Sequence, residues 1–179
     1  MNRTWAIVVA ALAVVAPASA MQKPGATGTA EPKSDKSFLV KAVEGGLAEI
    51  ELGKLAVQKG STPQVKQFGQ RMVDDHTKAN AQLQHIAATK NVVVPTEPDK
   101  QSRSMNARLE KLTGPEFDKE YLTAMISDHA EDVSEFQKEA TGGRDPDVTK
   151  FASTTLPTLE EHLRLAETTR MALASSHDR

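Results

Sequence analysis

Four long segments of this chain place apolar side chains alternately three and four residues apart, the spacing of an amphipathic α-helix. The clearest is 62–91, whose inward positions would be Val65, Gly69, Met72, His76, Ala79, Leu83 and Ile86. Residues 37–59, 113–142 and 145–174 have comparable faces, and no segment sustains the alternation of a β-strand. Aromatic residues make up only 4% of the chain, which suits helix packing. The pattern predicts an all-α fold.

Residues suited to helix ends separate these segments. Glycines that suit helix C-termini stand at Gly60 and at Gly142-Gly143. Predicted N-termini are Thr62 before Pro63, Thr113 in capping-box spacing with Glu116, and Asp145 before Pro146. The connection between the second and third long helices is longer and contains a short helix at 101–112. A long connection lets those two helices run parallel, so we expect a ferritin-like four-helix bundle with a short extra helix in that connection.

Residues 1–20 have the features of a secretory signal peptide. Arg3 precedes an apolar run from Trp5 to Ala16, and an Ala-x-Ala cleavage site ends at Ala20. We therefore expect export to the periplasm or cell envelope, with no transmembrane helix after cleavage. The polar, proline- and glycine-containing residues 21–36 are predicted to be a flexible tether, residues 37–174 the bundle domain, and 175–179 a tail.

Charge and cysteine content exclude several classes of protein. The chain has 22 basic and 24 acidic residues, a formal net charge of −2, so nothing favours nucleic acid as a partner. It has no cysteine, which excludes thiol catalysis, iron–sulfur ligation and covalent haem attachment. The sequence identifies neither a protein partner nor an oligomeric state.

Three of the five histidines share one context, an acid directly before the histidine: Asp75-His76, Asp128-His129 and Glu161-His162. At about 1.5 Å per residue, each lies near the midpoint of its helix, and Glu49 lies near the midpoint of the first. If the helices align end to end, His76, His129, His162 and Glu49 share one layer. Within that layer, we expect Glu49 towards the edge of its apolar face and His162 about 60° to one side of its own.

Such a layer has two interpretations, which the sequence does not separate. Three imidazoles and a carboxylate suit one transition metal ion: Zn, Fe, Cu or Ni. Alternatively, the same groups form a metal-free polar layer by hydrogen bonding to one another. The preceding acids, Asp75, Asp128 and Glu161, lie 100° round the helix from their histidines. We favour solvated edge charges for them. The alternative is that each acid reaches a histidine on a neighbouring helix and orients it behind a bound metal.

Several longer strings resemble a known family: Glu44 to Ala56, Arg71 to Lys78, Phe117 to Tyr121 leading into His129, and Leu156 to His162. Together with the signal peptide, they are similar to the secreted bacterial family catalogued as domain of unknown function 4142. The resemblance covers about residues 37–174. It implies an exported ferritin-like bundle and supplies no established activity.

The wider ferritin-like di-iron proteins carry Glu-x-x-His on two helices. Here Val73, Ile126 and Leu159 occupy the position three residues before each histidine, so a carboxylate-bridged di-iron site is not expected. The functional hypothesis is an exported metal-binding bundle with a role in envelope storage or stress. The rival is a non-catalytic interaction or scaffold protein with a metal-free layer. A histidine-based enzyme is less favoured because no partner residue is visible.

Overall fold

The computed structural model describes residues 35–177, with side chains through residue 175. It contains α1 (Asp35–Lys59), α2 (Pro63–Thr89), α3 (Lys100–Leu109), α4 (Gly114–Gly142) and α5 (Pro146–His177). This part of the chain has no β-strand, so the all-α prediction is confirmed. The predicted signal peptide and most of the predicted tether lie outside the described residues. None of these five helices combines the length and apolar character needed to cross a membrane.

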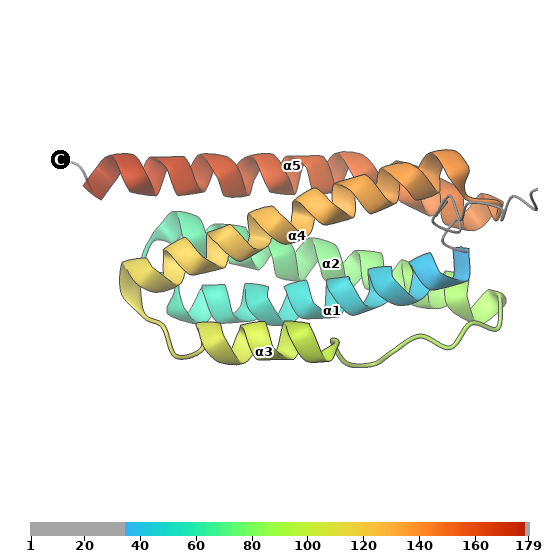
Figure 1. Cartoon of the computed structure of the whole chain (residues 1–179), viewed down its shortest axis with the longest axis horizontal. Coiled ribbons are helices and arrows are strands. Elements are labelled where there is room, and N and C mark those ends of the chain that lie inside the picture. Colours follow the sequence, from blue (N-terminus) through green and yellow to red (C-terminus); the bar gives the residue numbers. More distant parts are fainter. Residues whose placement is uncertain (1–34, 178–179) are drawn as a thin grey trace, which may run out of the picture. The chain divides into compact units, whose positions relative to one another are not determined.

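The four long helices form two antiparallel pairs, α1 with α2 and α4 with α5 (Figure 1). The long connection carries the chain back along the bundle, so α4 begins at the same end as α2 and runs parallel to it (Figure 1). α3 lies in this connection and packs on α1 and α4. The four-helix bundle with a ferritin-like crossover is therefore confirmed, short extra helix included.

Most predicted helix ends are close to the observed ones. Thr62 accepts a hydrogen bond from the Val65 amide, and Asp145 accepts from the amides at the start of α5, so both are N-caps as predicted. The capping box at Thr113 is wrong, because its side chain makes no cap hydrogen bond. Gly114, the residue after Thr113, has a φ of 61°, so it lacks the helical backbone of a first helical residue. α1 starts at Asp35 and α5 reaches His177, both beyond the predicted ends.

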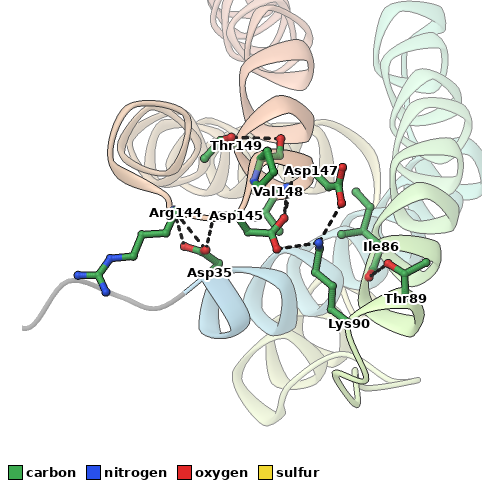
Figure 2. Close-up of polar contacts among 10 residues, drawn as sticks. Asp35, Ile86, Thr89, Lys90, Arg144, Asp145, Asp147, Val148 and Thr149 are labelled. Carbon is green, nitrogen blue, oxygen red and sulfur yellow. Dashed lines mark hydrogen bonds and ion pairs between the residues drawn. The ribbon is translucent and has the colours of Figure 1, made fainter.

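Polar contacts hold the α4–α5 turn against the start of α1 and the end of α2 (Figure 2). Asp35 accepts hydrogen bonds from the backbone amides of Arg144 and Asp145, at 3.2 and 2.7 Å. The Lys90 ammonium contacts the carboxylates of Asp145 and Asp147, at 2.7 and 2.9 Å. These contacts join residues far apart in sequence and fix the alignment of the two helical pairs at this end.

The interior consists of two apolar clusters with a polar layer between them. One cluster contains Phe68, Phe117 and Tyr121, and the other contains Phe38, Phe136 and Phe151. In each long helix, a buried polar residue lies between residues of the two clusters: Glu49 between Val43 and Leu52, His76 between Met72 and Leu83, His129 between Met125 and Phe136, and His162 between Leu159 and Ala166. The four polar residues therefore occupy the same level of the bundle.

α1 and α2 come into close backbone contact at two glycines. A Cβ on Gly69 would lie 2.7 Å from Ala56 Cβ and 2.8 Å from the Gly53 carbonyl oxygen. A Cβ on Gly53 would lie 2.7 Å from the Gly69 carbonyl oxygen. Only glycine permits this spacing, which brings Glu49 on α1 within reach of His76 on α2.

Replacing Gly69 with alanine should therefore separate the two helices. We expect G69A to lower the free energy of unfolding by about 1–3 kcal/mol, the usual effect of overpacking. G45A is the matched control, because a Cβ on Gly45 meets nothing within 4 Å. It should stabilise the helix by about 0.5–1 kcal/mol. Urea denaturation measures both, and equal stability of the two variants would contradict the close contact.

Candidate metal centre

Three helices place a histidine in the polar layer, and α1 places Glu49 beside them. His129 and His162 are 0% exposed, His76 5% and Glu49 2%. The ring centroids lie 5.3 to 5.6 Å apart in all three pairs. The four predicted side chains thus come together. Glu49 and His162 are more buried than the sequence indicated, since both were expected towards the edge of their apolar faces.

One nitrogen of each histidine is held by an oxygen acceptor. The Nδ1 atom of His76 lies 2.9 Å from Glu49 Oε2, and that of His129 lies 2.9 Å from the Met125 carbonyl oxygen. For His162 it is Nε2, which lies 3.0 Å from Asp75 Oδ2. A carbonyl and a carboxylate only accept, so each of these ring nitrogens carries the proton. The tautomer of each neutral ring is thereby fixed.

The remaining nitrogens are Nε2 of His76, Nε2 of His129 and Nδ1 of His162. One nitrogen from each of the three rings lies within 4.8 Å of the others. His129 Nε2 and His162 Nδ1 are 3.3 Å apart, while His76 Nε2 is buried without a hydrogen-bond partner among the described residues. In neutral rings these three atoms are lone-pair acceptors. Their convergence in a buried layer is unfavourable unless a positive charge lies between them.

The separation of two of these nitrogens matches that of two ligands of a tetrahedral metal ion. Metal–nitrogen bonds of about 2.0–2.1 Å at the tetrahedral angle separate two ligand nitrogens by about 3.3–3.4 Å. The 3.3 Å separation of His129 Nε2 and His162 Nδ1 falls in that range. We call His76, His129 and His162 the histidine triad.

Burial and neighbouring charges set the protonation of the layer. Burial lowers the pKa of His129, and it lowers the pKa of His162 to about 4 despite the opposing effect of Asp75. Burial acts on His76 in the same direction, but the Glu49 carboxylate outweighs it and raises its pKa. Burial would raise the pKa of Glu49, yet His76 and His129 lower it to about 2. At neutral pH, His129 and His162 are neutral and Glu49 is a carboxylate.

The acids expected near the histidines take different positions. Glu49 lies behind the rings of His76 and His129, with Oε1 3.3 Å from His129 Nδ1, and so does not face the converging nitrogens. Asp75 is not a solvated edge charge, because it contacts His162 from the neighbouring helix. Asp128 is exposed, and among the described residues it contacts no histidine. Glu161 pairs instead with Arg164, at 2.6 Å.

Two polar residues that the sequence analysis missed lie beside the triad. A cavity of about 330 Å³ is lined by His76, His162, Asn80 and Asp132. Asn80 is buried, donates to the Val43 carbonyl and leaves its Oδ1 without a partner among the described residues. The signal was available, since an asparagine one turn after His76 falls near the apolar face of α2. The cavity therefore borders the triad at His76 and His162.

Comparison with known proteins identifies the family. The profile of the family described as domain of unknown function (DUF4142) matches residues 19–169. The chain belongs to this family. No curated protein matches the DUF4142 chain.

Two solved structures share the fold of this DUF4142 protein. One is CopM in the Cu(I)-bound form, with a TM-score of 0.66 and 15% sequence identity, covering 78% of this chain and 96% of that chain. The other is a DUF305 fragment from Deinococcus radiodurans, with a TM-score of 0.67 and 14% identity, covering 77% and 95%. At these identities the similarity concerns the fold alone.

The assigned tautomers can be tested directly in the metal-free protein. Long-range ¹H–¹⁵N correlation spectra at pH 7 should show His129 neutral with its proton on Nδ1, and His162 neutral with its proton on Nε2. Because burial lowers the pKa of His162 to about 4, its signals should stay those of a neutral ring as the pH falls to about 5. Titration of His162 near 6.5, the value of an exposed imidazole, would contradict the geometry.

Proposed function

We propose that this protein binds one transition metal ion through His76 Nε2, His129 Nε2 and His162 Nδ1. The observation that carries this proposal is the convergence of these three nitrogens while an oxygen acceptor holds the other nitrogen of each ring. A metal ion supplies the positive charge that the facing lone pairs need. Glu49 and Asp75 would orient His76 and His162 and increase their basicity, as carboxylates behind metal-bound histidines do.

The ligand set narrows the class of metal. Neutral imidazole nitrogens suit Zn, Cu, Fe and Ni better than Mg or Ca. A structurally similar protein, CopM, was solved in a Cu(I)-bound form, which supports copper as the first metal to test. One buried site per chain fits sequestration or carriage of single ions, and not storage of a mineral. With the signal peptide expected at 1–20, the role would be metal handling or stress protection in the periplasm or cell envelope.

The rival function is a scaffold with a metal-free layer, and one observation favours it. His76 and Glu49 form a buried pair at 2.9 Å, and Glu49 raises the pKa of His76. A charged His76 beside the Glu49 carboxylate would tie α1 to α2 without any metal. A charged His76 would also carry a proton on Nε2, and that buried atom has no hydrogen-bond partner among the described residues, so we favour metal binding. If the triad binds a metal ion, the ion displaces the proton on His76 Nε2, so the affinity for the metal falls at acidic pH.

Metal content should depend on the triad. Protein purified without an affinity tag and loaded separately with Cu(I) or Zn(II) should hold about one ion per chain after desalting, measured by elemental mass spectrometry. H129A removes one of three ligands and should lose most of that metal. H85A is the matched control, since His85 lies exposed on α2, and it should bind as the unaltered protein does. Equal metal content in both variants, or none in the unaltered protein, would contradict the proposal.

Asp75 should tune the affinity without being a ligand. D75N keeps the size of the side chain but removes the charge that holds His162 Nε2, so we expect metal affinity to fall about 10–100-fold. D74N is the control, because the adjacent Asp74 is exposed and its side chain accepts a hydrogen bond from Gln70 rather than from a histidine. Competition titration with a chelator measures both dissociation constants. An unchanged affinity in D75N would show that the Asp75–His162 contact has no part in binding.

A further inference from the structure

An acidic groove lies on the side of the bundle formed by α1, α4 and the start of α3. It has a volume of about 310 Å³. Six carboxylate side chains line it besides Glu49: Glu44, Asp99, Asp128, Glu131, Asp132 and Glu135. Lys41 also lines it and lies 3.9 Å from Glu135. Burial and the neighbouring acids raise the pKa of Asp128 to about 6 and that of Asp132 above its ordinary value. With one cation among the remaining acids, the groove is still net negative and attracts cations.

Glu49 connects this groove to the histidine triad. Its side chain lines the groove although it is only 2% exposed, and its Oε1 accepts no hydrogen bond from a described residue. Its other oxygen contacts His76. Glu49 and Asp132 also line the cavity beside the triad, so the two hollows share these two side chains as a common wall. A buried carboxylate oxygen without a hydrogen bond, at the inner end of a negative groove, is suited to a passing cation.

We propose that the acidic groove is the access route by which a divalent transition metal cation reaches the histidine triad. This inference rests on the proposed metal-binding function. The outer acids, of which Glu44 and Glu131 are examples, raise the local concentration of the cation. Glu49 and Asp132, which line both the groove and the cavity, then bind the cation transiently as it passes from the groove to the three nitrogens. The acids act on the rate of loading, whereas the imidazoles determine the bound geometry.

The rate of Co(II) loading tests this route, because the visible absorption of Co(II) reports nitrogen coordination in a tetrahedral site. The metal-free full chain is mixed with Co(II) in a stopped-flow instrument. The groove variant is E44Q/E131Q, and the matched control is E160Q/E167Q, which removes the same charge from α5 outside the groove. The groove variant should load about tenfold more slowly at low ionic strength, within the range for electrostatic steering. Its final spectrum should equal that of the control.

The salt dependence of the unaltered protein gives a second readout that needs no substitution. Its loading rate should fall as salt rises, and the difference between the two double variants should shrink. Equal loading rates in the two variants, or a rate in the unaltered protein that does not change with salt, would overturn the access route and leave the metal site intact. No Co(II) spectrum in the unaltered protein would contradict the proposed function, and the access route with it.

Discussion

The structure depends on how a buried polar layer satisfies its own hydrogen bonds. Three imidazoles and one carboxylate lie between two apolar clusters, where an unpaired polar group costs about 2–7 kcal/mol. Glu49, the Met125 carbonyl and Asp75 each satisfy one ring nitrogen. The remaining nitrogen of His76 has no hydrogen-bond partner among the described residues, and those of His129 and His162 lie 3.3 Å apart. Under the proposed function, a metal cation would complete the layer.

The bundle architecture fixes the positions of the side chains in this layer. Gly53 and Gly69 let α1 and α2 approach closely, which brings Glu49 to His76. The crossover containing α3 makes α2 and α4 parallel, while α5 returns antiparallel to both (Figure 1). Because each histidine lies near the midpoint of its helix, all three lie at one level of the bundle whichever way each helix runs. The contacts around Asp35 and Lys90 hold that alignment at one end (Figure 2).

Periodicity and end signals in the sequence predicted the helices, their order and the shared level of Glu49, His76, His129 and His162. The rotation of each helix about its axis was less accessible. Glu49 was expected towards an edge, yet it is buried, because α1 packs against α2, α3 and α4 rather than against one neighbour. His162 was expected about 60° from the apolar stripe of its helix, yet it is 0% exposed.

Ring orientation could not be predicted at all, since it depends on a backbone carbonyl and on an acid from another helix. The acids of the groove look like ordinary solvated charges in sequence. Only the packing of α1, α3 and α4 brings them together. The sequence also does not say which histidine Asp75 contacts, because Asp75 and His162 lie on different helices and meet only in the folded bundle.

X-ray absorption spectroscopy of the metal-loaded protein reports the atoms bound to the ion and so decides whether the histidine triad holds it. We predict three imidazole nitrogens at about 2.0–2.1 Å for a zinc ion, with the outer-shell scattering that imidazole rings give. A first shell made mainly of oxygen, with fewer than two imidazoles, would place the ion elsewhere. That result would leave the histidine layer as a structural element alone.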